Sequence, residues 1–166
     1  MYSKEVMKHF SNPKNFGEMK DPDGVGKVGN IICGDIMWLY IKVKEKKGKK
    51  TITDVKFKTL GCAAAIASSS MTTVLVKGKT VEEALAITKE DVLKALSGLP
   101  PMKVHCSLLA TEALAEAVYD YLKKNNLEIP KFLQEHHERI EKENKEAEKK
   151  YEEFMKSQEQ MLSCKK

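Results

Sequence analysis

Residues 36–43 follow an alternating pattern, with Trp38, Tyr40 and Lys42 on the face opposite the aliphatic positions. The apolar positions that would share one face are Met37, Leu39, Ile41 and Val43. A period of two is typical of a strand with one buried face. A lysine- and glycine-rich turn at residues 46–49 separates this run from residues 51–60, where Val55 and Phe57 take the buried positions. The short connection predicts an antiparallel hairpin.

Helical spacing replaces alternation after residue 61. Residues 2–10, 62–76 and 105–124 are predicted helices, and the stretch 21–29, with its three glycines, is expected to begin as a loop. Two short helices are expected after Thr80 and Thr88, because acidic residues follow each threonine as in an N-capped first turn. The predicted apolar face of the helix at 62–76 consists of Ala64, Ala67, Met71, Val74 and Leu75. One small sheet followed by several helices indicates the α+β class.

A boundary is predicted at Ile129-Pro130, which divides the chain into a domain of residues 1–128 and a charged helical extension of residues 129–166. Apolar residues recur every seven positions in the extension, at Leu133, Ile140, Ala147, Phe154 and Met161. The complementary positions are mostly polar, which disfavours a self-sufficient coiled coil. We expect this helix to lie along the domain or against a second copy. His136 and His137 are expected on its solvated face.

Composition narrows the range of functions. The 166 residues carry a net charge of +5, and no apolar run reaches the ~18 residues of a membrane helix. The opening residues lack the apolar core of a signal peptide, and four scattered cysteines do not form a secreted disulfide framework, so a cytoplasmic location is expected. Six lysines within residues 42–50 indicate a solvated hairpin tip. Nucleic-acid binding is not expected, because no aromatic residues are interleaved with them.

Three cysteines stand at comparable points of the predicted structure. Cys33 lies in a bend before a strand, and Cys62 and Cys106 lie at the starts of helices. With Asp35 and His105 they offer three thiolates, a carboxylate and an imidazole, and soft sulfur ligands select zinc, cuprous copper or iron–sulfur clusters. The intervals of 28 and 43 residues between the cysteines exclude a zinc ribbon. From spacing alone, a shared metal site and buried structural cysteines both stay open.

A third possibility is a cysteine-nucleophile enzyme that uses Cys106 with His105 as its base. Side chains of adjacent residues at a helix start point in different directions, so this pair is poorly placed for proton transfer. We rank it below the metal site.

The cysteine motifs resemble those of the IscU/NifU-type family of iron–sulfur cluster assembly scaffolds. The resemblance covers roughly residues 1–127 and includes the opening pattern Asn12-Pro13-Lys14-Asn15. The motifs are Cys33-Gly34-Asp35, Gly61-Cys62-Ala63-Ala64 with Ser68-Ser69-Ser70, and Lys103-Val104-His105-Cys106-Ser107. The resemblance implies a three-stranded antiparallel sheet with helices packed on one face. It also implies that Cys33, Cys62 and Cys106 bind a cluster, that Asp35 or His105 supplies the fourth ligand, and that Lys103 lies beside the site.

The same resemblance implies a scaffold that is not a turnover enzyme. A cysteine desulfurase would supply persulfide sulfur, with Cys106 as its acceptor. Iron would complete a 2Fe–2S cluster, and apo acceptor proteins would receive it. A homodimer is expected for the cluster-bearing form. Residues 99–103 are similar to a segment read by DnaK-type chaperones, although Met102 stands where valine is usual. The alternative is a zinc-binding protein that uses the same cysteine, aspartate and histidine residues. Cys164 matches no motif and is expected to be a spare thiol near the chain end.

Overall fold

A three-stranded antiparallel sheet forms the centre of the molecule. The structure is a computed structural model that describes residues 1–30 and 34–163, so Cys33 and Cys164 lie outside the described residues. The strands, in the spatial order β1-β2-β3, are β1 (Gly24–Asn30), β2 (Asp35–Lys46) and β3 (Lys49–Leu60). The predicted hairpin and its buried face are confirmed, because Met37, Leu39 and Ile41 have no exposed surface.

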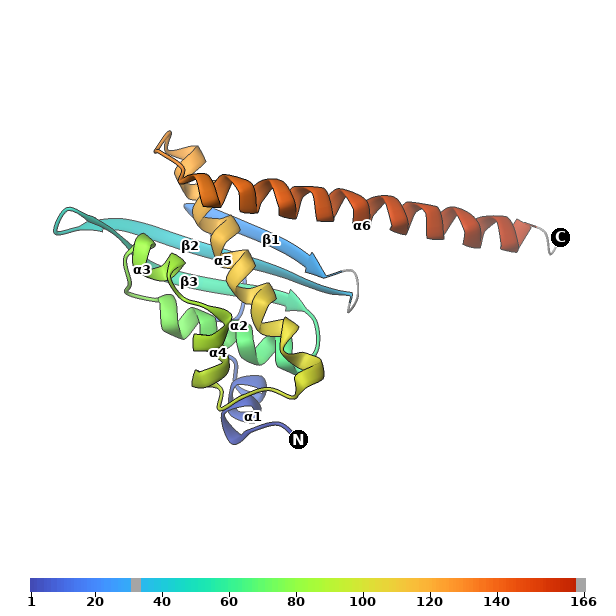
Figure 1. Cartoon of the computed structure of the whole chain (residues 1–166), viewed down its shortest axis with the longest axis horizontal. Coiled ribbons are helices and arrows are strands. Elements are labelled where there is room, and N and C mark those ends of the chain that lie inside the picture. The colour runs from blue at the N-terminus through green and yellow to red at the C-terminus, as the bar shows by residue number, and fades with distance from the viewer. Residues whose placement is uncertain (31–33, 164–166) are drawn as a thin grey trace.

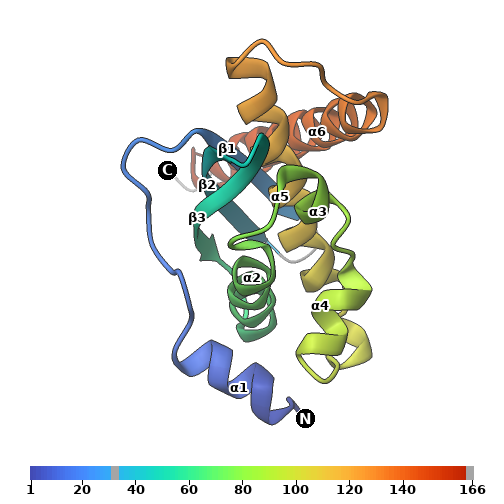
Figure 2. The same ribbon diagram turned by 90° about the vertical axis from the view of Figure 1, so that its left-hand side faces the viewer.

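The helices are α1 (Lys4–Ser11), α2 (Ala63–Val76), α3 (Val81–Leu85), α4 (Lys89–Ala95), α5 (His105–Lys124) and α6 (Lys131–Ser163), with a 3₁₀ turn, η1, at Pro101–Lys103. Helices α2 and α5 pack on one face of the sheet, and the other helices adjoin these two (Figures 1 and 2). The α+β class, the three-stranded sheet and the extended C-terminal helix are therefore confirmed. Within residues 1–30 and 34–163, no helix has both the length and the apolar character needed to cross a bilayer.

The stretch 21–29 begins as a loop, as predicted, and β1 follows from Gly24. Its glycines allow α5 to lie unusually close to the sheet. A Cβ atom at Gly24 would lie 2.2 Å from the Ala117 carbonyl oxygen, and one at Gly26 would lie 1.9 Å from that of Ala113. The glycines that suggested a loop are thus required by tertiary packing.

The buried side chains of α2 include as many with hydroxyl groups as apolar ones. The prediction that Val74 belongs to its buried face is wrong, because that side chain is 47% exposed. The buried polar residues of α2 are Ser68, Ser69, Ser70, Thr72 and Thr73. Small side chains allow neighbouring elements to approach closely, and a buried hydroxyl is tolerated where it is hydrogen-bonded. Ser70, for example, bonds to Nδ1 of the buried His9, 2.7 Å away.

The first half of α6 packs against α5, with Leu133 and Ile140 fully buried. The expectation of a solvated face at His136 and His137 is wrong. Their Nδ1 atoms lie 3.2 and 2.8 Å from the two carboxylate oxygens of Glu116 on α5. The second half of α6 extends away from the sheet (Figure 1). That residues 1–128 and 129–166 form separate units stays a prediction.

Candidate metal centre

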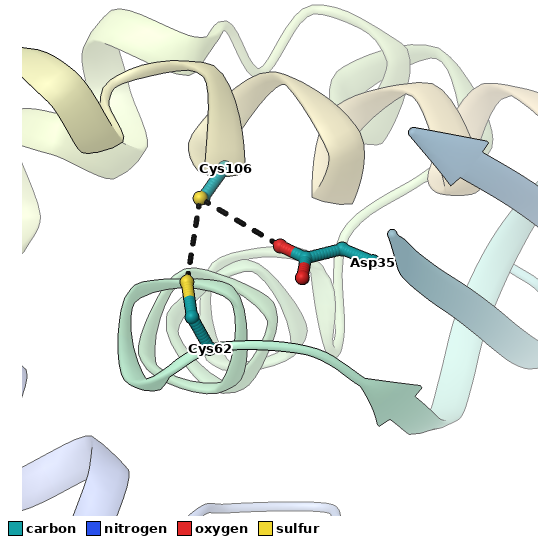
Figure 3. A group of neighbouring side chains, drawn as sticks. All are labelled: Asp35, Cys62 and Cys106. Atoms are coloured by element: carbon teal, nitrogen blue, oxygen red, sulfur yellow. Dashed lines mark hydrogen bonds between the residues drawn. The ribbon is translucent and has the colours of Figure 1, made fainter. Parts of the chain in front are cut away.

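Three side chains from three separate elements meet at one end of the sheet (Figure 3). Asp35 begins β2, Cys62 directly precedes α2, and Cys106 is the second residue of α5. The Sγ atoms of the two cysteines lie 3.6 Å apart, and Cys106 Sγ lies 3.9 Å from Asp35 Oδ2. One potential ligand atom from each residue lies within 4.8 Å of the others. We call Asp35, Cys62 and Cys106 the ligand trio.

The ligand trio is buried on one side and accessible on the other. Asp35 is 5% exposed and Cys106 has no exposed surface, whereas Cys62 is half-buried. At 3.6 Å apart, the two sulfur atoms are not bonded to each other in a disulfide. A carboxylate and two sulfur atoms at this separation suit a cation that accepts both oxygen and sulfur ligands, such as zinc or iron. Cys62 marks the side from which a cation or a partner protein can approach.

The backbone around the cysteines leaves helix N-termini facing the site. Cys62 is the N-cap of α2, and its side chain makes no capping hydrogen bond. The N-cap of α5, Val104, makes none either, and neither helix has an acidic residue in its first turn. The N-terminal end of a helix carries partial positive charge and unpaired amide groups. Both helix starts therefore favour an anionic ligand set beside them.

Gly61 leaves room for the Asp35 carboxylate. A Cβ atom at position 61 would lie 3.1 Å from Asp35 Cγ and 3.0 Å from the Ala65 Cβ atom, closer than ordinary van der Waals contact. The sequence signal for this role was the glycine beside a candidate ligand. Tyr2 and Leu99 pack around the cysteines and were not predicted to do so.

The other predicted site residues are not part of the ligand trio. His105, the first residue of α5, is half-buried, and it does not belong to the group of side chains whose ligand atoms lie within 4.8 Å. Lys103 ends η1 and is also half-buried. Among the described residues, the ligand trio is the one group of three such side chains this close together. The roles of Cys33, His105 and Lys103 stay predictions.

Comparison with known proteins places this fold and site in a family. The model of the NifU-like N terminal domain matches residues 1–128. The chain belongs to this family. The chain is also similar to the iron–sulfur cluster assembly scaffold proteins IscU 1 and IscU 2 of Archaeoglobus fulgidus. Each is 58% identical to this chain over 125 residues, which cover 75% of this chain and 79% of the relative. Residues 129–166 lie beyond the family match.

Another relative is the iron sulfur cluster assembly protein 1, mitochondrial, of Debaryomyces hansenii, at 50% identity over 78% of this chain and 73% of its own. A cytoplasmic location of this chain thus stays a prediction. Among solved structures, the putative iron–sulfur cluster assembly scaffold protein for the SUF system of Fervidobacterium islandicum AW-1 superposes with a TM-score of 0.59. It is 28% identical, over 70% of this chain and 96% of that chain.

Proposed function

We propose that this chain is a scaffold on which an iron–sulfur cluster is assembled and from which it is passed to other proteins. The observation that carries the proposal is the ligand trio, at one end of the sheet in a chain 58% identical to cluster assembly scaffolds. The protein in this role accepts sulfur and iron as cargo and is not a turnover enzyme.

A 2Fe–2S cluster is the proposed cargo, with Cys33, Cys62, Cys106 and Asp35 as its ligands. His105 is the alternative to Asp35. Each sulfur delivered as a persulfide takes up two electrons to become sulfide. Two ferrous ions that become ferric supply half of the electrons for two sulfides, and an external reductant supplies the rest. Cys106 is the proposed persulfide acceptor, with Lys103 beside it.

The aspartate distinguishes this ligand set from that of a permanent electron carrier, which holds its cluster with four thiolates. A hard carboxylate oxygen is a poorer match for the iron of a sulfide cluster than a thiolate. In this proposal, Asp35 makes the cluster easier to release. Weak retention at one position is what a scaffold needs.

The proposed partners are a cysteine desulfurase, apo acceptor proteins and a second copy of the chain in the cluster-bearing form. A DnaK-type chaperone is proposed to read residues 99–103. The exposed position of Met102, whose side chain is 83% accessible, supports a protein contact at this segment.

An anaerobic assembly experiment tests the function. The purified chain would be incubated with ferrous iron, cysteine, a reductant and a desulfurase, and then measured for iron, acid-labile sulfide and visible absorption. We expect equal amounts of iron and sulfide and a coloured product, and Cys164→Ala should behave in the same way. Tight zinc binding without any sulfide incorporation would instead favour the zinc-binding function.

A further inference from the structure

Ser68, in the serine run of α2, contacts α5, the helix that carries Cys106. The Ser68 hydroxyl lies 3.0 Å from the backbone carbonyl oxygen of Cys106, and Ser68 has no exposed surface. Less than two helical turns separate Ser68 from Cys62, which caps the same helix. This hydrogen bond therefore joins the backbone that carries one thiol to the backbone that carries the other.

Neighbouring hydrogen bonds direct the Ser68 proton toward Cys106. A serine hydroxyl has one proton to donate, and the Ser68 oxygen also lies 3.2 Å from the Ala65 carbonyl oxygen. The Ser69 hydroxyl approaches that same Ala65 oxygen more closely, at 2.6 Å. The Cys106 carbonyl oxygen is thus the better acceptor for Ser68, because it is closer than the Ala65 oxygen, which the Ser69 hydroxyl also approaches.

We propose that Ser68 is a positioning residue of the metal centre, which fixes the separation of the Cys62 and Cys106 thiols by tying α2 to the backbone of α5. The inference rests on the proposed function, because it concerns the same ligand trio. Metal ligands separated by 3.6 Å must hold that separation within a few tenths of an ångström to share one metal ion or cluster. A hydrogen bond between the two helices opposes displacement of one relative to the other.

Ser69 provides a matched control. It is as deeply buried as Ser68, but its hydroxyl bonds within α2 and lies 3.5 Å from the Met37 sulfur on β2. Ser68→Ala and Ser69→Ala each remove one buried oxygen atom from adjacent positions. A purely structural role predicts similar effects of the two changes on metal binding, whereas a positioning role predicts an effect of Ser68→Ala alone.

The probe is cobalt(II), which binds such ligand sets and reports sulfur ligation by an intense thiolate-to-metal absorption band. We expect Ser68→Ala to bind cobalt about tenfold more weakly than wild type, in the range known for residues that orient metal ligands. Its band per bound cobalt should be shifted or weakened. Ser69→Ala should keep the wild-type affinity and spectrum, and thermal unfolding of the metal-free proteins would show whether the two are equally destabilised.

If Ser68→Ala does not fold, the comparison is made between Ser68→Thr and Ser68→Val. Threonine keeps the hydroxyl, and valine has the shape of threonine without the hydroxyl. The threonine variant should then bind cobalt at least about tenfold more tightly than the valine variant. Equal affinity and equal spectra within either pair, beside a wild type that binds cobalt, would overturn the inference and leave the proposed function intact. A wild type that binds neither cobalt nor a cluster would overturn both.

Discussion

Helices α3 and α4 begin differently from helices α2 and α5. Helices α3 and α4 begin with complete capping boxes. The Thr80 hydroxyl accepts a hydrogen bond from the Glu83 amide, and the Glu83 carboxylate accepts one from the Thr80 amide. Thr88 and Asp91 repeat the arrangement at α4. These short helices, of five and seven residues, depend on local hydrogen bonds because each buries little surface.

Helices α2 and α5 begin without side-chain caps, and both begin at the ligand trio. They are 14 and 20 residues long and are stabilised by burial against each other and the sheet. In α3 and α4, which carry none of the ligand trio, capping is complete. In α2 and α5, no side chain caps the first turn, where a ligand residue lies. The stability that a cap would supply is offset by tertiary packing.

The largest expected effect comes from removing a thiol at an uncapped start. Cys106→Ala, and separately Cys62→Ala, should abolish cluster assembly, because each thiolate is a large share of the ligand set. Acid-labile sulfide and visible absorption after anaerobic assembly measure the loss. Thr88→Ala, at a capped start, should assemble a normal cluster. Retention of a full cluster by Cys106→Ala would contradict the assignment of the site.

The next largest effect concerns release of the cluster to an acceptor protein. Asp35→Cys should hold the cluster more tightly and transfer it to an apo-ferredoxin about tenfold more slowly, since a thiolate replaces the hard oxygen ligand. The appearance of the visible circular dichroism of the acceptor gives the rate. Asp35→Asn, which keeps an oxygen ligand, should transfer faster than Asp35→Cys. Equal rates from intact clusters on wild type and Asp35→Cys would show that ligand hardness does not control release.

A methyl group at the start of α2 should also be costly. Gly61→Ala places a Cβ atom 3.1 Å from Asp35 Cγ, and overpacking of this kind typically destabilises by about 1–3 kcal/mol. Urea unfolding of the metal-free protein measures this change, and a cobalt titration should show weaker binding. Gly29→Ala is the control, because its nearest contacts would lie at 4.0 Å. Identical behaviour of the two variants would remove the spatial role of Gly61.

Exchanging the two kinds of helix start should produce opposite changes in stability. Cys62→Ser supplies α2 with a capping hydroxyl and should stabilise the metal-free protein by about 0.5–1 kcal/mol, while destroying the metal centre. Thr88→Ala should destabilise by about 1 kcal/mol and leave the centre intact. Urea unfolding gives both values. A metal-free Cys62→Ser less stable than wild type would mean that α2 needs its thiol for packing rather than for cargo.

The smallest expected effect is a dependence on acid. The hydrogen bond from the Thr88 amide holds the pKa of Asp91 below its ordinary value of 3.8, and that from the Thr80 amide holds the pKa of Glu83 below 4.5. A carboxyl whose pKa is lower in the folded protein stabilises the fold above its unfolded-state pKa, and this contribution is lost as pH falls through the folded-state pKa.

Asp91→Asn removes one of these contributions. Its urea midpoint should therefore fall less than that of wild type between about pH 5 and about pH 3. Glu90→Gln, at a neighbouring first-turn position outside the capping box, is the control and should follow the wild type. Parallel curves for wild type and Asp91→Asn would show that the capping box does not contribute to acid sensitivity.

The sequence predicts an element well where the pattern that reveals it lies within the element itself. The alternation around Leu39 reveals β2, because its two faces meet different environments. The threonine caps reveal α3 and α4, because a capping box spans only four residues. Strand β1 is missed because Gly24 and Gly26 are explained by α5, about 90 residues away in the chain, and no local pattern contains that contact.

The site also has parts that the sequence predicts and parts that it does not. Residue type and motif resemblance identify Asp35, Cys62 and Cys106, but their spacing cannot show that the three meet. The hydrogen bond from Ser68 to Cys106 and the pairing of His137 with Glu116 each join two helices. Such contacts depend on how helices pack, and the composition of one helix does not specify that.

The chain has one tryptophan, Trp38, on the side of β2 opposite to its buried apolar face. It pairs with Lys27 on the neighbouring strand β1, whose amine lies 5.8 Å from the centre of the indole ring. Trp38 also lies three residues from Asp35, outside the ligand trio. The molecule thus contains a single indole fluorophore, three residues along β2 from a member of the ligand trio. Because iron–sulfur clusters absorb in the range where indole emits, filling and emptying of the site become visible as quenching and recovery of fluorescence, without an added label.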